Sequence, residues 1–335
     1  MYQEKYHTKD ISSFTFLVTG GGGFIGSNLV EYLLKNNAKK VVILDNFETG
    51  HKKNIIDFIK SERCELIEGD IRNLVICKQA MKGVDYVLHQ AALGSVPRSI
   101  NDPITSNEVN INGFLNILQT AKESSTVKKM VYAASSSTYG DSKLLPKIEK
   151  VIGKPLSPYA VTKYVNELYA DVFSKVYGFH SIGLRYFNVF GPKQDPNGAY
   201  AAVIPSFLDS AINNKPIMIN GDGEQTRDFT FVENAVQANI KAIFSNINRH
   251  EVFNVAVGER TSINDLWSLI KNLSGSQNDV VYGPPRLGDI RDSLANIEKG
   301  HNLLNYTPKF KLKEGIELTY NWFVSNISFI YSKNT

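Results

Sequence analysis

The chain contains 335 residues, 42% of them hydrophobic and 21% charged, and its formal net charge is +4. It has no dense run of lysine and arginine, which argues against nucleic-acid binding. No apolar stretch approaches the roughly 20 residues that a membrane-spanning helix needs, so we expect no membrane partner. The two cysteines, Cys64 and Cys77, provide neither a disulfide framework nor the spacing of metal ligands.

The N-terminal residues, Met1 to Asp10, are polar and charged, which is unlike a secretory signal peptide. Together with the two isolated thiols, this pattern leads us to expect a cytoplasmic protein. The stretch before Phe14 is either a short packing helix or a frayed end, and the sequence leaves both interpretations open.

Short apolar runs alternate with amphipathic helical stretches as far as residue 185. This alternation predicts βαβ crossovers and a doubly wound, mostly parallel α/β sheet of Rossmann type. From residue 186 the pattern becomes irregular, so we assign 1–185 to a nucleotide-binding domain and 186–335 to a smaller α/β substrate-binding region. Some segments of 186–335 are expected to return to the main sheet. The predicted strands are Phe14–Val18, Val41–Leu44, Leu66–Ile67, Val84–Leu88, Met130–Ala134 and Ser181–Leu184, and the main predicted helices are Phe24–Lys35, Ile104–Lys122 and Pro158–Val176.

A glycine-rich turn follows the first predicted strand and opens a helix. Gly20, Gly23 and Gly26 let the backbone turn tightly and approach a pyrophosphate at the helix N-terminus. Asp45 follows the second strand, where a carboxylate accepts hydrogen bonds from the adenosine ribose and repels a 2′-phosphate. This order predicts that residues 1–185 bind NAD rather than NADP. The other candidate cofactor residues are Phe24 and Ile25 at the helix start, Asn46 beside Asp45, and Asp70 and Ile71 after the third strand, where an ordinary turn aspartate is the alternative.

A phenol and an ammonium lie one helical turn apart at Tyr159 and Lys163, on one face of a helix that Pro158 is suited to start. A nearby cation stabilises a phenolate and lowers the pKa of tyrosine from about 10 towards the range of a general base. Tyr139 and Lys143 have the same spacing, but the glycine, aspartate and serine between them favour a loop. We therefore expect only the first pair to be catalytic.

A cluster of hydroxyl groups ends the predicted strand Met130–Ala134, at Ser135, Ser136 and Ser137. Ligands bind at the carboxyl ends of parallel strands, where such hydroxyls can hydrogen-bond a reacting oxygen. Capping of the strand end is the structural alternative. The chain contains the glycine turn, the acidic residue, the serine cluster and the Tyr–Lys pair in the expected order. We therefore favour catalysis and choose Ser135 and Ser137 as candidates.

Five further stretches carry specific motifs. They are LHQAALGSVPR at 88–98, SPYAVTK at 157–163, LRYFNVFG at 184–191, GDGEQTRDF at 221–229 and RLGD at 286–289. In these stretches and in the glycine turn, the sequence resembles the extended short-chain dehydrogenase/reductases, and within them the bacterial UDP-N-acetylglucosamine 4-epimerases. The resemblance covers Thr19 to Tyr320.

The resemblance implies a chemistry for the Ser–Tyr–Lys set. Tyr159 removes the proton of the sugar 4-hydroxyl while NAD takes hydride from C4, and Ser135, with Ser137 as a second candidate, holds the same oxygen. Lys163 binds the nicotinamide ribose and tunes the tyrosine. The 4-keto intermediate then turns over and receives hydride on its other face, so NAD stays bound throughout. The motif at 88–98 adds Gln90, Ala91 and Ala92 to the implied cofactor residues.

The resemblance also implies how the UDP-sugar is held. Arg227 and Arg286 resemble clamps for the two phosphates, since a guanidinium matches a diphosphate in bidentate geometry. For a single arginine, a surface salt bridge is the ordinary alternative. The other implied contacts are Asn188 at the sugar–phosphate end, Ala202, Val203 and Phe207 around the uracil, Asp289 at the uridine ribose, and Gly94 and Ser95 facing the sugar.

Ser293 bears on the choice of sugar. By resemblance, it lies where enzymes restricted to non-acetylated hexoses carry a bulky tyrosine. A small side chain leaves space for a 2-acetamido group, because it removes a clash. An ordinary packing serine is the alternative. We therefore expect the reversible conversion of UDP-N-acetylglucosamine to UDP-N-acetylgalactosamine, as in polysaccharide biosynthesis.

Related activities and partners remain as alternatives. Dehydratases and decarboxylases of this family carry acids where this chain has Ser136 and Ser137, so these reactions are not expected. A 4-epimerase of UDP-N-acetylglucosaminuronic acid or of UDP-glucose stays open. The non-enzyme alternative is an NAD-binding regulatory sensor, which the intact Ser–Tyr–Lys set disfavours.

The resemblance implies a homodimer, with a four-helix interface formed by Ile104–Lys122 and Pro158–Val176.

Overall fold

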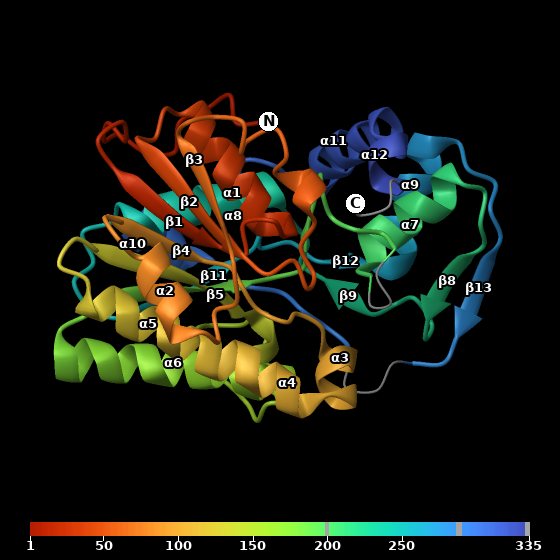
Figure 1. The fold of residues 1–335 in the computed structure, drawn as a ribbon. Helices are drawn as coiled ribbons and strands as arrows, with labels where there is room; N and C mark the ends of the chain where they lie inside the picture. Colours follow the sequence, from red (N-terminus) through yellow and green to blue (C-terminus); the bar gives the residue numbers. More distant parts are fainter. Residues whose placement is uncertain (198–200, 286–289, 332–335) are drawn as a thin grey trace.

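The computed structural model describes residues 1–197, 201–285 and 290–331 (Figure 1). A seven-stranded sheet with the order β11-β6-β5-β4-β1-β2-β3 forms its centre, and every neighbouring pair of strands is parallel. The predicted Rossmann-type sheet is therefore confirmed. Its strands are β1 Thr15–Thr19, β2 Lys40–Asp45, β3 Cys64–Glu68, β4 Tyr86–His89, β5 Lys129–Ser135, β6 Ser181–Tyr186 and β11 Glu251–Val255.

The order of the strands fixes where a ligand can enter. The chain runs outward through β1, β2 and β3, then returns to the other side of β1 and continues through β4, β5 and β6. Strands that diverge in this way leave a crevice at their carboxyl ends, between β1 and β4. Gly20 follows β1 and Gln90 follows β4, so the predicted cofactor residues lie on both sides of this crevice.

Helices cover both faces of the sheet, because successive residues of each buried strand point to opposite sides. Phe16 and Val18 of β1 pack with one layer of helices, whereas Leu17 packs with the other. The first layer contains α1 Phe24–Lys35 and α8 Val232–Ile243, and the second contains α2 Leu74–Ala80, α5 Phe114–Glu123 and α6 Pro158–Tyr177 (Figure 1).

The structure confirms one predicted helix and shows that another is interrupted. The helix predicted at Pro158–Val176 is confirmed as α6, which Ser157 caps through the N–H of Ala160. The helix predicted at Ile104–Lys122 is interrupted: α4 Pro103–Asn107 leads into a π-helical stretch, Glu108–Gly113, before α5 begins. Such π segments recur at functional sites, and this one contains Asn110, whose side chain supports the loop after β4.

A smaller lobe lies beside the carboxyl ends of the strands (Figure 1). Its core joins α7 Val203–Ile212, α9 Ile263–Ser274 and α11 Leu312–Ser325 to β8 Ile217–Asn220. Meanwhile β11, α8 and α10 Glu298–Leu304 lie with the large sheet, so the chain crosses between the lobes repeatedly. The remaining elements are α3 Val96–Asn101, α12 Ile327–Tyr331, β7 Val189–Phe190, β9 Thr226–Arg227, β10 Thr230–Phe231, β12 Thr261–Ser262, β13 Val280–Gly283 and the 3-10 turns Lys52–Asn54 and Ser136–Tyr139.

The N-terminal segment is neither of the two forms left open by the sequence. Residues 1–13 contain no helix, yet Tyr2, Tyr6 and Ile11 are buried against the first helical layer. The N–H of Tyr6 donates to the Tyr32 hydroxyl at 2.7 Å, and the Tyr6 hydroxyl donates to Glu233 at 2.8 Å. The segment is thus held by specific contacts. Among the described residues, none of the helices has the length and apolar character needed to traverse a bilayer.

Candidate active site

The glycine turn lies between β1 and α1, where the backbone has no room for side chains. Gly20 has φ +68°, and a Cβ there would lie 2.7 Å from the nitrogen of Ala91. A Cβ on Gly26 would lie 2.0 Å from the carbonyl oxygen of Gly20. With Gly23 as the N-cap of α1, this turn leaves the N–H groups at the helix start available to a phosphate. The cradle fits the predicted dinucleotide.

Asp45 joins the glycine turn to the end of β2. Its carboxylate accepts the N–H of Gly22 and the N–H of Phe47, both at 2.8 Å. Burial raises the pKa of Asp45, while these backbone hydrogen bonds act in the opposite direction. The side chain of Asn54 donates to the carbonyl of Gly22 at 2.9 Å, which holds the turn from the other side. The predicted ribose-binding carboxylate is therefore held in a fixed orientation.

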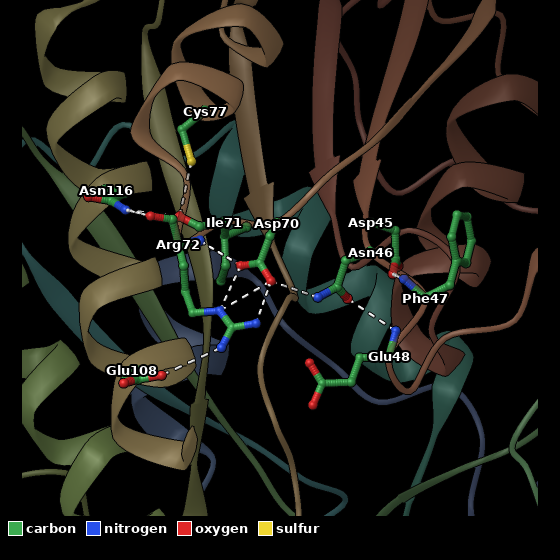
Figure 2. Close-up of polar contacts among 10 residues, drawn as sticks. All are labelled: Asp45, Asn46, Phe47, Glu48, Asp70, Ile71, Arg72, Cys77, Glu108 and Asn116. Carbon is green, nitrogen blue, oxygen red and sulfur yellow. Dashed lines mark hydrogen bonds and ion pairs between the residues drawn. The ribbon is translucent and has the colours of Figure 1, made fainter. Parts of the chain in front are cut away.

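A polar network extends from this position along the ends of β2 and β3 (Figure 2). The Asn46 amide donates to Asp70 at 2.9 Å, and the Arg72 guanidinium donates to both oxygens of Asp70 at 2.7 to 3.1 Å. Arg72 also lies 3.6 Å from Glu108 and holds the pKa of Asp70 below its usual range. The structure thus brings the predicted adenosine residues together. Sequence reasoning missed Arg72, although its partner Asp70 lies only two residues earlier in the chain.

The loop after β4 forms the other side of the crevice. Gln90 is held in a triangle: its side chain accepts from Tyr186 at 3.1 Å and donates to Asn239 at 3.2 Å, and Asn239 donates to Tyr186 at 2.7 Å. The N–H of Ala91 lies 3.3 Å from the Thr19 hydroxyl. Ala92 follows in the same loop. These contacts fix the loop against the glycine turn.

Further along this loop, Asn110 clamps Leu93 by accepting its N–H at 2.8 Å and donating to its carbonyl at 3.1 Å. The clamp precedes Gly94 and Ser95, the predicted sugar contacts. Ser95 has φ +104°, a conformation rarely adopted by serine, and its hydroxyl caps α3 by accepting the N–H of Arg98 at 3.3 Å. Such strain persists only where the surroundings impose it. Asn110 was not predicted, since its spacing from Leu93 carries no local signal.

The predicted Ser–Tyr–Lys set converges at the end of β5 and the first turns of α6. Tyr159 forms a side-chain hydrogen bond with Ser135, whose oxygen also accepts the N–H and the hydroxyl of Ser137 at 3.1 and 2.9 Å. The Lys163 ammonium donates to the carbonyl of Ala133 at 2.8 Å and lies 5.9 Å from the centroid of the Tyr159 ring. All four candidate catalytic residues therefore lie in one cluster.

Burial controls the charges in this cluster. It lowers the pKa of Lys163 to about 8, and it raises the pKa of Tyr159, against which the hydrogen bond from Ser135 acts. The tuning of Tyr159 by Lys163 stays a prediction. The competing pair is not helical: Tyr139 ends a 3-10 turn and donates to Asn254 at 2.6 Å, and Lys143 lies in the following loop, as expected.

A cavity between β7, α7 and β9 collects the predicted nucleotide contacts of the smaller lobe. Its walls include Asn188, Ala202, Val203, Phe207 and Arg227. Ser293 is buried but is not one of the wall residues, and its N–H donates to the carbonyl of Thr226 at 3.1 Å. Arg286 and Asp289 lie outside the described residues. The wall residues that sequence reasoning missed include Phe190, Met218, Asn220, Gln225, Phe229 and Ile263.

One wall residue of the cavity, Asn188, follows the strand next to the one that carries Ser135. Ser135, the last residue of β5, pairs with Tyr186, the last residue of β6. Asn188 follows only two residues later and has φ +35°. This combination of sheet, glycine turn and catalytic cluster defines a dinucleotide-binding enzyme of the short-chain dehydrogenase/reductase class.

Comparison with known proteins gives the family. The chain belongs to the NAD dependent epimerase/dehydratase family, whose model matches residues 16–256. It is 38% identical over 312 residues to a putative UDP-glucose 4-epimerase of Methanocaldococcus jannaschii, a match that covers 92% of this chain and 98% of the relative. The cofactor is accordingly NAD, in agreement with the prediction.

Two solved structures extend the comparison. A UDP-N-acetylglucosamine 4-epimerase from Methanobrevibacter ruminantium, in complex with UDP-N-acetylmuramic acid, has a TM-score of 0.88 and 39% identity and covers 93% of this chain and 99% of its own. A UDP-glucuronic acid 4-epimerase from Bacillus cereus, in complex with UDP-glucuronic acid and NAD, has a TM-score of 0.86 and 31% identity, with the same coverage of both chains. These proteins act on different sugars, so similarity alone leaves the sugar open.

Proposed function

We propose that this protein is a UDP-sugar 4-epimerase that interconverts UDP-N-acetylglucosamine and UDP-N-acetylgalactosamine. The observation that carries the proposal is the position of the cavity, whose walls gather five predicted nucleotide contacts beside the end of β6. A nucleotide held there directs its sugar towards Tyr159. The names of the relatives support 4-epimerisation of a UDP-sugar.

NAD, when bound, accepts hydride from C4 and returns it, which is the chemistry that no side chain supplies. Gly20, Gly23 and Gly26 would hold its pyrophosphate, and Asp45 its adenosine ribose. Because the reaction causes no net oxidation, the cofactor does not have to be released between turnovers. The contacts that fix the glycine turn to Asp45 and Asn54 therefore favour a retained cofactor.

The protein's own residues handle the proton. Tyr159 is placed to take the proton from the sugar 4-hydroxyl, and its hydrogen bond with Ser135 orients the phenol oxygen. Ser137 donates to Ser135, which fixes the Ser135 hydroxyl beside the phenol of Tyr159. The buried ammonium of Lys163 provides the positive charge that favours a phenolate.

The acetamido sugar is favoured by the small side chain at position 293. The N–H of Ser293 donates to the carbonyl of Thr226, the residue before the predicted diphosphate clamp Arg227. A serine there leaves a volume that a tyrosine would fill. UDP-glucose and UDP-N-acetylglucosaminuronic acid remain the alternatives.

The experiment is a substrate panel followed by NMR with wild-type protein and the Ser293→Tyr variant. Wild-type protein should convert UDP-N-acetylglucosamine and UDP-glucose, and the variant should lose the acetamido substrate by at least about tenfold in kcat/KM while keeping UDP-glucose. Equal losses on both sugars would contradict the role of Ser293. If the protein converts only the uronic acid, then the uronic acid and not UDP-N-acetylglucosamine is the substrate.

We further propose that the protein is a homodimer built on α6 and α4. Leu168, Val172 and Val176 form an apolar stripe along α6 with exposed fractions of 48%, 48% and 65%, and Ile104 of α4 is 73% exposed. Residues four apart on a helix share one face, so the stripe is continuous. Exposed apolar stripes of this kind support pairing between copies.

A further inference from the structure

The extended segment that carries Arg227 has two different sides. Gln225, Arg227 and Phe229 line the cavity. Side chains of alternate residues in an extended chain point to opposite sides, so the residues between them face away from it. Asp228 is one of these, and it is fully buried. A carboxylate therefore lies directly behind the predicted diphosphate clamp.

Asp228 joins three segments that are distant in the sequence. One carboxylate oxygen accepts the N–H of Val257, and the other accepts the N–H groups of Gly258 and Ala295, all at 3.1 Å. Burial raises the pKa of Asp228 to about 7, and the three backbone donors act against that shift. A carboxylate that accepts several backbone N–H groups gives strong, directed hydrogen bonds. The turn after β11 and the segment around Ala295 are thereby fixed to one side chain.

The main chain of the same segment holds two further predicted contacts. The carbonyl of Asp228 accepts the side-chain amide of Asn188 at 3.1 Å, which helps to keep this residue at its positive φ. The carbonyl of Thr226 accepts the N–H of Ser293 at 3.1 Å. Asn188, Arg227 and Ser293 thus converge on a single short stretch, and Asp228 is its buried anchor.

We propose that Asp228 is a positioning residue for the nucleotide diphosphate of the substrate. Its carboxylate fixes the turn at Val257 and the segment at Ala295 behind the strand, so that Arg227 faces the ligand in one orientation. This inference rests on the proposed function. It assigns Asp228 no contact with the ligand and no part in the proton transfer, so binding of UDP alone should depend on it.

The test compares Asp228→Asn with wild-type holoenzyme. The amide keeps the shape of the side chain but turns one acceptor oxygen into a donor that faces a backbone N–H. The Kd of UDP measured by calorimetry and the KM of the UDP-sugar should both rise by about 10- to 100-fold, while kcat changes by less than about threefold. Asp265→Asn is the matched control: this carboxylate accepts the hydroxyl of Ser262, the N-cap of α9 in the same lobe, and its variant should bind UDP as wild type does.

The results of these measurements distinguish a positioning role of Asp228 from a merely structural one. A lower melting temperature with unchanged UDP affinity would mean a merely structural role and would overturn the proposal. If the variant does not fold, hydrogen exchange of the wild-type protein decides: UDP should slow exchange of the amides of Val257, Gly258 and Ala295, and unchanged exchange would overturn the proposal. Wild-type protein that does not bind UDP at all would overturn the proposed function and this inference with it.

Discussion

Each catalytic side chain is oriented by a different neighbour. Ser135 is held by Ser137, two residues later in the sequence, and Lys163 of α6 by the carbonyl of Ala133 on β5. The residue types and their spacing were predictable because the serine cluster and the Tyr–Lys pair are local patterns. Asn110 was not predictable, since its partner Leu93 lies in a loop that only the folded sheet brings beside it.

His89 provides a pH-dependent prediction at the scale of one residue. Burial lowers its pKa from 6.5 to about 3, and its ring is 2.7 Å from the Thr19 hydroxyl. Because the unfolded chain takes up this proton at a higher pH than the folded chain, wild-type stability falls as the pH drops from about 6.5 towards 3. Relative to His89→Gln, wild type should lose up to about 1.4 kcal/mol per pH unit in that window, measured by urea unfolding. If the difference in free energy of unfolding between wild type and His89→Gln stays constant from pH 7 to pH 4, His89 is not buried as a neutral ring.

At the scale of elements, some helices and strands could be predicted from local patterns, whereas others depend on tertiary contacts. The helix α6 was predictable, since a capping serine, a proline and a terminal glycine mark its ends. The strand β11 was missed, because its place beside β6 depends on residues about 70 positions away in the chain. The π-helical interruption around Asn110 was missed for a similar reason: the sequence there has ordinary helical periodicity.

The N-terminal segment offers a prediction about packing between elements. The Tyr6 hydroxyl donates to Glu233, a buried carboxylate on α8, and Tyr6→Phe removes that donor. The free energy of unfolding should fall by about 1 to 3 kcal/mol, because a buried charged acceptor loses a partner. Epimerase activity at 25 °C should stay unchanged. Tyr282→Phe, at an exposed tyrosine, is the control and should shift stability by less than about 0.5 kcal/mol.

At the scale of the whole molecule, the lobes are interleaved, because the chain leaves the large sheet after β6 and returns to it through α8 and β11. Composition and strand alternation predicted the large sheet. The shape of the smaller lobe was not predictable, since its short strands pair across long stretches of chain. Five predicted nucleotide contacts nevertheless line one cavity there, because each was assigned from a motif rather than from secondary structure.

Association between copies is also a property of the whole molecule. Leu168→Glu places a charge in the middle of the exposed stripe on α6 and should convert a dimer into a monomer in sedimentation-velocity experiments. Asp171→Glu, on the same helix, keeps its charge and should leave the dimer intact. A wild-type protein that sediments as a monomer at micromolar concentration would contradict the proposed interface.

The most direct test of the central claim follows a deuterium label at C4. Purified protein is incubated in ordinary water with UDP-N-acetylglucosamine deuterated at C4, without added NAD, and the product is examined by NMR and mass spectrometry. The account predicts UDP-N-acetylgalactosamine that keeps the deuterium at C4, and a loss of at least about 100-fold in rate in Tyr159→Phe. Product that has lost the label to solvent, or undiminished turnover in the variant, would contradict it.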